Sequence, residues 1–361
     1  MKIAIIVGTR PEIIKMSPII RECENKENLD YFIIHTGQHY SYNMDRVFFE
    51  QLNLPKPKYN LNIGSGTHGK QTGKILISIE KVLYEERPDI VLVEGDTNTV
   101  LAGALAACKL NIKVGHVEAG LRSYDRAMPE EINRVLVDHC SDFLFTPTKK
   151  SKQLLLNEGI DKEKIFVTGN TIVDAVNYNI KLAKKKNENF KKMGLNKKDY
   201  FLLTVHRQEN VDFENRFKGI IKGVKDIINK YSIPVVYPIH PRSSKMLEKY
   251  KINTNSIYII QPEDYLNFLM LEKNARLVLT DSGGIQEEAC ILGVPCVTLR
   301  DNTERPETLE IGSNILAGAE SDKIKDSVST MINNKEKWNN PFGNGKSAKK
   351  ILDILINYFS D

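Results

Sequence analysis

Short apolar runs alternate with amphipathic stretches along most of the chain. Strands that are buried on both faces of a parallel sheet appear in a sequence as continuous runs of Val, Ile, Leu and Phe. The pattern therefore predicts alternating strands and helices in two series. The first series of predicted strands is 3–7, 31–35, 90–94, 113–117, 143–145 and 165–168, and the second is 201–205, 235–239, 257–260, 277–280 and 296–299.

The two series predict two domains, which suits a length of 361 residues. The strand end at Thr168–Asn170 is followed by a helical pattern, so we place the boundary near residue 170. The tail from Ser347 repeats apolar residues at helical spacing, which predicts a last helix that must pack on something. We expect an α/β fold with two Rossmann-like domains, 1–169 and 170–343, that face each other across a cleft, and a C-terminal helix in 344–361.

Composition narrows the class of protein. The balance of 51 Lys and Arg against 46 Asp and Glu gives a net charge of +5, which suits a small anionic substrate but not the concentrated basic face of a nucleic-acid binder. The five cysteines form no C-x-x-C pair, and His35 and His39 do not share a helix face, so neither a disulfide framework nor a metal site is indicated. The chain shows no signal-peptide pattern and no apolar run of about 18 residues. We expect a cytoplasmic protein without a membrane or nucleic-acid partner.

Polar and ionisable residues follow the predicted strands. In open α/β sheets, ligands bind at the carboxyl ends of the strands, so these residues are candidates for a site. The segments are Gly8–Glu12, Thr36–His39, Glu94–Thr97, His116–Arg122, His206–Asn210, His240–Pro241 and Asp281–Gly284.

Gly64–Lys70 matches the pattern G-x-G-x-x-G and approaches a Walker A motif. No proper strand precedes it, and Gln71 stands where the Walker pattern needs Ser or Thr. We interpret the segment as a mobile loop, with a substrate contact as the minor alternative.

Asp281–Glu288 is a stronger candidate for a phosphate site, because it follows a predicted strand and opens a predicted helix. The N–H groups of the helix start and the helix dipole would stabilise a diphosphate there. A plain strand-to-helix turn with an N-cap is the alternative. Glu288 favours the nucleotide, because it lies one helical turn past Gly284 and would accept hydrogen bonds from ribose or sugar hydroxyls.

Cations lie in or beside the same loops, and together they favour an anionic ligand, although each alone is more often structural. They are Arg10, Lys15, Arg122, Arg207 and Arg305.

Carboxylates at the strand ends are the candidates for acid–base chemistry. Asp96 and Glu118 end adjacent predicted strands, and neighbouring carboxylates raise one another's pKa toward neutral pH. Glu130 and Glu131 begin a predicted helix, where acidic residues are commonly dipole partners. His206 follows the first strand of the second series. It is a candidate acid–base group, and a structural histidine is the alternative.

Long motifs in these loops resemble those of a known family, the non-hydrolysing UDP-N-acetylglucosamine 2-epimerases, in order and over nearly the whole chain. The motifs are Gly8–Glu12, His116–Ser123, Pro129–Arg134, His206–Asn210, Asp281–Glu288 and Thr303–Glu307. The resemblance implies the fold of B-type glycosyltransferases and a homodimer. It also implies that the first domain carries the acid–base carboxylates, that the second binds UDP, and that the C-terminal helix crosses back to the first domain.

The resemblance also implies roles for individual residues. The reacting sugar would be surrounded by the catalytic residues Asp96, Glu118, Glu131 and His206. The rest of the UDP-sugar would be held by Arg10, Lys15, Glu263, Phe268, Ser282, Gly283, Gly284, Glu288 and Arg305, with Phe268 near the uracil. Bacterial members have a second, regulatory UDP-GlcNAc site, which is matched in part by Gln38, His39, Arg207 and His240. The stretch after His39 is longer than in the common bacterial version.

The chemistry of the substrate favours elimination without a cofactor. The hydrogen at C2 of UDP-GlcNAc is not adjacent to a carbonyl, so direct deprotonation is too costly for a side-chain base. Transient oxidation would need NAD, for which the sequence has no credible fingerprint. Loss of the C2 proton together with UDP gives 2-acetamidoglucal, and re-addition of UDP with a proton on the other face gives UDP-ManNAc. This route needs a diphosphate clamp and carboxylates near both sugar faces, and which carboxylate serves which face stays open.

We therefore predict an isomerase, a UDP-GlcNAc 2-epimerase, with UDP-GlcNAc, UDP-ManNAc and UDP as its ligands. The alternatives are a UDP-sugar glycosyltransferase, a hydrolysing epimerase that releases ManNAc and UDP, and a non-catalytic UDP-sugar sensor. UDP-ManNAc would feed surface polysaccharide or glycan synthesis.

Overall fold

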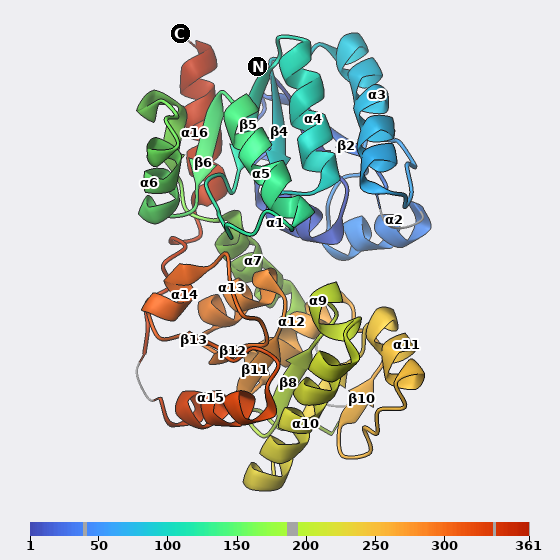
Figure 1. The fold of residues 1–361 in the computed structure, drawn as a ribbon. Helices are drawn as coiled ribbons and strands as arrows, with labels where there is room; N and C mark the ends of the chain where they lie inside the picture. Colours follow the sequence, from blue (N-terminus) through green and yellow to red (C-terminus); the bar gives the residue numbers. More distant parts are fainter. Residues whose placement is uncertain (39–41, 186–193, 335–336, 361) are drawn as a thin grey trace. The chain divides into compact units, whose positions relative to one another are not determined.

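The computed structural model describes residues 1–38, 42–185, 194–334 and 337–360. The chain forms two compact units (Figure 1). Unit 1 comprises Met1–Ala175 together with Phe342–Asp361, and unit 2 comprises Val176–Pro341. The C-terminal segment thus belongs to the unit that the N-terminus begins.

The described part of unit 1 contains a seven-stranded parallel sheet in the order β3-β2-β1-β4-β5-β6-β7. Its central strand β1 has the sequence KIAIIV and is buried from its second residue onward, as expected for a strand covered by helices on both faces. The strands are β1 (Lys2–Val7), β2 (Asp30–His35), β3 (Tyr59–Asn60), β4 (Ile90–Glu94), β5 (Lys113–Val117), β6 (Phe143–Thr146) and β7 (Ile165–Val167).

Helices cover both faces of this sheet, because right-handed connections run in opposite directions from β1 and from β4. Figure 1 shows α3, α4 and α5 side by side on one face, whereas α1 packs against the C-terminal helix α16. The helices are α1 (Arg10–Glu24), α2 (Tyr42–Gln51), α3 (His68–Glu86), α4 (Asn98–Lys109), α5 (Pro129–Cys140), α6 (Lys149–Asn157), the 3₁₀ turn η1 (Lys162–Lys164) and α16 (Ser347–Ser360). The division between the units falls within α7 (Thr171–Lys185).

Unit 2 repeats the arrangement with a six-stranded parallel sheet, among its described residues, in the order β10-β9-β8-β11-β12-β13. The strands are β8 (Phe201–Thr204), β9 (Val235–Pro238), β10 (Tyr258–Ile260), β11 (Leu277–Thr280), β12 (Cys296–Thr298) and β13 (Asn314–Leu316). The helices are α9 (Gln208–Val211), α10 (Glu214–Tyr231), α11 (Pro241–Lys249), α12 (Tyr265–Asn274), α13 (Gly283–Leu292), α14 (Pro306–Glu310) and α15 (Ser321–Asn333). One large core cluster lies between this sheet and the helices α10 and α15.

The α/β class and the two parallel sheets confirm the fold class predicted from the sequence. Every predicted strand is present, but β3 and β13 were missed, because two and three residues of mixed polarity leave no apolar run. The loop predicted at 64–70 is shorter than expected, since α3 already begins at His68. Over the described residues, no helix is both long enough and apolar enough to cross a membrane.

Candidate functional site

Both sheets share a topological feature that places ligand sites in α/β proteins. The strand order reverses between β1 and β4 in unit 1, and between β8 and β11 in unit 2. At such a point the loops at the strand ends diverge to opposite faces and leave a crevice for a ligand. The predicted site residues gather at these two edges, one group in each unit.

Asp96 and Glu131 are joined through one arginine. Asp96 follows β4, and its Oδ2 accepts a hydrogen bond from Arg134 Nη2, while Arg134 Nη1 donates to Glu131 Oε2 at 2.6 Å. The Glu131 carboxylate also accepts the backbone N–H groups of Ser123 and Tyr124, at 2.9 and 3.0 Å. Burial acts to raise the pKa of Glu131, but these hydrogen bonds and the Arg134 charge outweigh it and hold the pKa below its ordinary value. Two predicted catalytic carboxylates therefore flank one guanidinium.

Glu118 directly follows β5 in a strained backbone conformation. Its φ of +69° is one that side chains other than glycine seldom adopt, and its N–H donates to the Phe145 carbonyl at 3.1 Å. The carboxylate Oε2 accepts hydrogen bonds from Lys15 Nζ and, at 2.9 Å, from Asn170 Nδ2. Lys15 Nζ also lies 3.3 Å from Oε1 of Glu94, the last residue of β4. The ammonium predicted to hold UDP thus contacts two carboxylates of unit 1.

Glu12 ties two loops of this edge together, although no role was predicted for it. Its Oε2 accepts the Gly8 N–H at 2.6 Å, and its Oε1 accepts the hydroxyls of Thr9 at 2.9 Å and of Thr97 at 2.7 Å. Burial raises the pKa of Glu12 to about 7 against the lowering effect of these hydrogen bonds, and the charge of Asp96 adds to the rise. The loop after β1 and the loop after β4 are therefore coupled through a carboxyl group that titrates near neutral pH.

The structure corrects the role predicted for Arg122, which was expected to favour an anionic ligand. Its buried guanidinium lies 2.7 Å from Asp138 Oδ2 and donates to Glu158 at 2.7 and 2.6 Å. Despite burial, His116 and Arg122 hold the pKa of Asp138 below its ordinary value. The His116 ring bridges two groups: its Nδ1 lies 2.7 Å from Asp138 Oδ1, and its Nε2 lies 2.8 Å from the Gly95 carbonyl oxygen. Arg122 is therefore committed to a structural network under the loop that carries Asp96.

Two other predicted residues of unit 1 lie at the same edge. Arg10 begins α1, and its guanidinium carbon lies 5.6 Å from the centroid of the Phe48 ring. Gln38 follows β2, and its Oε1 accepts hydrogen bonds from the N–H and the hydroxyl of Thr99 at 3.1 and 2.7 Å. His39 lies outside the described residues.

In unit 2, the predicted catalytic and regulatory residues meet around one buried carboxylate. Asp281, after β11, accepts the backbone N–H groups of His206 and Arg207 at 3.0 and 2.9 Å, and its Oδ1 lies 3.1 Å from His206 Nδ1. These contacts hold the pKa of Asp281 below its ordinary value in spite of burial. The His206 and His240 rings are 5.5 Å apart, and burial together with the His206 charge lowers the pKa of His240. His240 Nδ1 accepts the Arg242 N–H at 3.1 Å, which fixes its tautomer.

The start of α13 has the geometry of an anion site. Ser282 is its N-cap residue, and the side chain of Ser282 makes no capping hydrogen bond. The first N–H groups of a helix have no intrahelical partner and lie at the positive end of its dipole. A Cβ atom at Gly283 would lie 3.9 Å from Cζ of Arg305, and a Cβ atom at Gly284 would meet nothing within 4 Å. Arg305 therefore flanks the helix start, where its Nε lies 2.7 Å from Oε1 of the buried Glu287.

The remaining predicted ligands of UDP lie on α12 and α13. Glu288 is buried, and its Oε1 accepts the hydroxyl of Tyr265 at 2.8 Å. Phe268 is partly buried against the core cluster that contains Tyr200 and Leu202. Glu263 lies just before α12, and burial followed by the charge of Asp264 raises its pKa.

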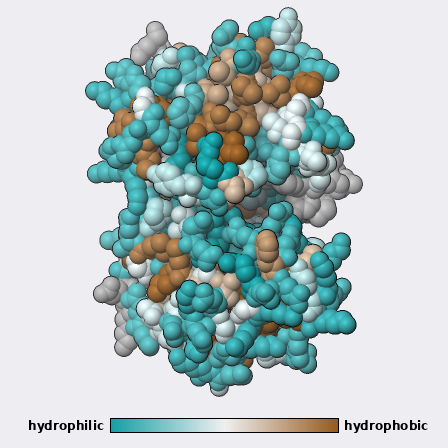
Figure 2. All heavy atoms as spheres, viewed as in Figure 1, coloured by the Kyte–Doolittle hydropathy of each residue, from teal (hydrophilic) through white to brown (hydrophobic). Residues whose placement is uncertain are grey.

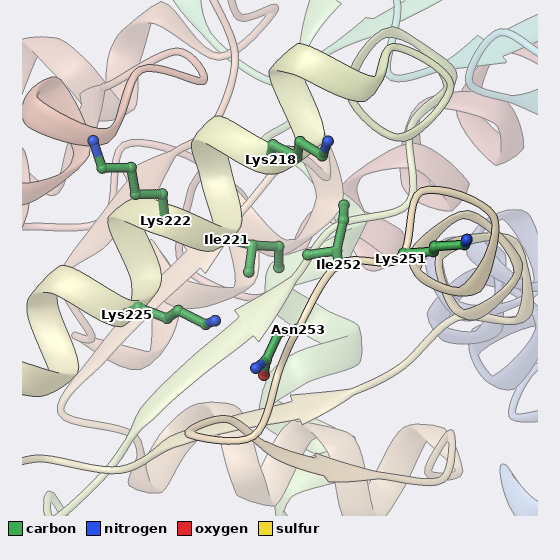
Figure 3. A pocket seen from close by; sticks show the side chains of 7 residues that line it. All are labelled: Lys218, Ile221, Lys222, Lys225, Lys251, Ile252 and Asn253. Atoms are coloured by element: carbon green, nitrogen blue, oxygen red, sulfur yellow. The ribbon is translucent and has the colours of Figure 1, made fainter.

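A surface hollow on unit 2 lies apart from these residues. It is lined by Lys218, Ile221, Lys222, Lys225, Lys251, Ile252 and Asn253 (Figure 3). Figure 3 shows the lysine side chains pointing in different directions, and Lys218 pairs with Glu214 at 2.6 Å. The hollow contains no predicted site residue. Within the described ranges, no group of three His, Cys, Asp or Glu side chains is arranged to hold a metal ion.

The structure thus assembles the predicted residues as two groups. Asp96, Glu118 and Glu131 share the edge of unit 1, whereas His206 and the residues around α13 share the edge of unit 2. Two parallel-sheet units, with carboxylates gathered at one sheet edge and an uncapped, glycine-rich helix start at the other, are typical of nucleotide-sugar enzymes with a B-type glycosyltransferase-like fold.

Comparisons with known proteins identify the family within this class. A sequence model of the family UDP-N-acetylglucosamine 2-epimerase matches residues 21–356. A relative from Methanocaldococcus jannaschii named UDP-N-acetylglucosamine 2-epimerase is 62% identical, covering 98% of this chain and 99% of its own, and one of the same name from Methanococcus maripaludis is 58% identical, covering 98% of both. The crystal structure of the M. jannaschii UDP-GlcNAc 2-epimerase in complex with UDP-GlcNAc and UDP is 61% identical with a TM-score of 0.92, covering 99% of this chain and 100% of its own.

The chain belongs to the UDP-N-acetylglucosamine 2-epimerase family. The family predicted from the sequence is confirmed, and with it the prediction of an isomerase that acts as an epimerase of UDP-N-acetylglucosamine.

Proposed function

We propose that the chain interconverts UDP-GlcNAc and UDP-ManNAc by elimination of UDP and its re-addition, and that Asp96, Glu118 and Glu131 act on the sugar. The observation that carries the proposal is the placement of these three carboxylates at one sheet edge, each in contact with a cation. Arg134 bonds to Asp96 and Glu131, and Lys15 bonds to Glu118. Cationic partners favour the ionised form of a carboxylate, and an ionised carboxylate is the form that removes a proton.

The reaction needs two kinds of group. One carboxylate removes the C2 proton while the C1–O bond breaks, and the electron pair leaves with UDP. Re-addition of UDP to 2-acetamidoglucal, with a proton delivered to the opposite face of C2, gives the epimer. The leaving diphosphate must be held while it carries the developing charge, and preorganised donors do this best.

For that second task we propose the residues of unit 2. The N–H groups at the start of α13, from Ser282 to Gly284, and the guanidinium of Arg305 would bind the diphosphate. Glu288, Glu263 and Phe268 would contact the ribose and the base, and Arg10 would add a cation from unit 1. His206, held by Asp281, would act on the sugar as a fourth catalytic residue. Unit 1 is thus the acid–base domain and unit 2 the UDP domain in this proposal.

The regulatory site stays a proposal built on Gln38, His39, Arg207 and His240. His240 and Arg207 are supported by their place beside His206 and Asp281. Gln38 is supported by its place at the edge of unit 1 that carries Asp96.

We also propose a cytoplasmic homodimer. The exposed apolar side chains Ile77 and Tyr84 on α3, and Ile132 and Leu136 on α5, support an interface with a second copy. Figure 2 shows apolar surface on the face of unit 1 that α3, α4 and α5 form in Figure 1. Sedimentation of the double variant I132E/L136E tests the proposal: a monomer is expected, and an unchanged dimer would move the interface elsewhere.

Incubation with UDP-GlcNAc in D2O, followed by proton NMR, tests the reaction. The proposal expects UDP-ManNAc as the product, deuterium at C2 of both epimers, and traces of 2-acetamidoglucal with UDP. Release of free ManNAc would indicate the hydrolysing alternative, and no product without an acceptor would indicate a transferase or a sensor. Hydrogen retained at C2 of the epimerised product would sink the elimination mechanism.

A further inference from the structure

One ammonium group is shared between two buried carboxyl groups in unit 1. Lys15, Glu94 and Glu118 have side chains that are 9%, 3% and 4% exposed. Two carboxylates and one ammonium would leave a net negative charge in a place with little water. An uncompensated buried charge is costly enough that such a group neutralises instead.

The contacts of the two carboxyl groups are unequal. Glu118 accepts hydrogen bonds from both Lys15 and Asn170. Glu94 Oε1 is buried and 3.3 Å from Lys15 Nζ, but it accepts no hydrogen bond. The ammonium is therefore directed at Glu118, and Glu94 lacks the donors that would stabilise a negative charge on that oxygen.

Three of the four charged groups near Glu94 favour its protonated form. Lys15 and Glu12 approach it from α1, Glu118 from the loop after β5, and Asp96 from the loop after its own strand. Lys15 is the cation among these four, and the other three carry carboxyl groups. Burial, followed by the charges of Glu118, Glu12 and Asp96, raises the pKa of Glu94 well above its ordinary value against the opposing effect of Lys15.

We propose that Glu94 is a positioning residue that carries a proton in the working enzyme, so that Lys15 is left to the Glu118 carboxylate. Glu118 is then held ionised and oriented as a base for the sugar. This assignment rests on the proposed function for the role of Glu118, but the protonation of Glu94 itself does not. Glu94 thus acts on the reaction through Lys15 and Glu118, without contact with the substrate.

Infrared spectroscopy tests the proton on Glu94 directly. The wild-type protein at pH 7 should show the carbonyl stretch of protonated carboxylic acids, which ¹³C-labelled glutamate shifts and which E94Q weakens. Glu12 and Glu272 also have raised pKa values and supply the part of the band that remains. The matched control E22Q, near the end of α1, should leave the band unchanged. A band that is equally strong in E94Q would overturn the proposal. Because this readout needs no turnover, it stands apart from a failure of the epimerase reaction.

The pH profile of kcat/KM tests the link to Glu118. K15M should move the acid limb of the profile upward by about one pH unit or more, since an opposite charge shifts a carboxyl group by about 1 to 3 units. K15R, which keeps the charge, should restore the limb toward the wild-type position. An unmoved limb in an active K15M would overturn the proposal.

A double variant keeps the test decisive if K15M is too unstable to assay. K15M/E94Q leaves one carboxylate in the cluster, as the proposal says the wild type has, so K15M and K15M/E94Q should melt at nearly the same temperature. A large rescue of K15M by E94Q would mean that Glu94 is charged in the wild type, and that result would overturn the proposal.

Discussion

The two sheet edges are built on the same strand order but differ in their electrostatics. At the edge of unit 1, burial raises the pKa of Glu12 to about 7 and that of Glu94 well above its ordinary value. At the edge of unit 2, Asp281 and Glu304 are as deeply buried, yet their pKa values are lowered. The difference lies in the charge of the donors, because the guanidinium of Arg300 forms two hydrogen bonds with Glu304, at 3.0 and 2.9 Å. The donors to Glu12 are one backbone N–H group and two hydroxyls.

The same strand order thus holds carboxyl groups in two different electrostatic settings. A carboxyl group with a raised pKa can change its charge near neutral pH, whereas a carboxylate that stays ionised can accept a proton or hold cations and backbone N–H groups in place. The edge of unit 1 combines both kinds of group, since Glu131 stays ionised there beside Glu12 and Glu94. The edge of unit 2 holds Arg305, through its ion pair with Glu287, beside the start of α13.

The largest expected effect is a loss of turnover on substitution at the edge of unit 1. D96N, E118Q and E131Q should each lower kcat by ~10² or more, the usual scale for loss of an acid–base group, while UDP affinity changes little. Steady-state kinetics and calorimetry on the same preparations measure both quantities. The matched control is E130Q, at the neighbouring position on α5. Near-wild-type turnover in any of the three would remove that residue from the reaction.

The next effect falls on binding and should arise in unit 2. R305A and E288A should weaken UDP binding by about 1 to 3 kcal/mol, the range for a hydrogen bond to a charged group and for a buried group left unpaired. The control R242A removes a partly exposed arginine that pairs with Asp212 at 2.6 Å. Unchanged UDP affinity by calorimetry in both site variants would move the nucleotide elsewhere. R305A is compared with R305A/E287Q, because removal of Arg305 alone leaves Glu287 buried without its ion pair.

The sequence predicted the fold class because its signals are local. Apolar runs mark the buried strands, and the segments that follow them hold Asp96, Glu118, His206 and Ser282. The short strands β3 and β13 carry too few residues for such a signal.

The partners of the site residues were harder to predict, because they depend on distant parts of the chain. Lys15 and Glu118 are 103 positions apart, and Glu12 and Thr97 are 85 apart, so no spacing rule brings them together. Arg122 was predicted to bind an anion because the sequence does not show its contacts with Asp138 and Glu158. Those contacts are set by tertiary packing. A clue for Glu12 was present: an acidic residue in the first turn of a helix after a strand end.

A smaller effect concerns stability and pH at the edge of unit 1. The raised pKa of Glu12 means that the protonated form fits the folded state better, so its contribution to stability is present below pH 4.5 and is lost as pH rises through about 7. E12Q cannot ionise, so its stability relative to wild type should increase with pH across this window, by at most about 1.4 kcal/mol per pH unit. Urea unfolding at pH 5, 6, 7 and 8 measures this slope. A parallel pair of curves for E12Q and wild type would show that Glu12 is ionised throughout.

The smallest effect tests the difference in chain path between the units. Unit 1 is completed by residues from the other end of the chain, because α16 begins where Asp174 accepts the N–H groups of Ser347 and Ala348 at 3.2 and 3.1 Å. Asp174 thus caps a helix that is distant in sequence. D174A should cost about 1 kcal/mol, the usual value of an N-terminal cap. The loss should appear in hydrogen exchange as weaker protection of α16 and of α1, against which it packs. The matched control is D226A in unit 2, which removes the acceptor of the Ser321 hydroxyl at 2.7 Å beside the start of α15. It should leave α16 unchanged, so equal loss of protection at α16 in both variants would contradict the assignment of this helix to unit 1.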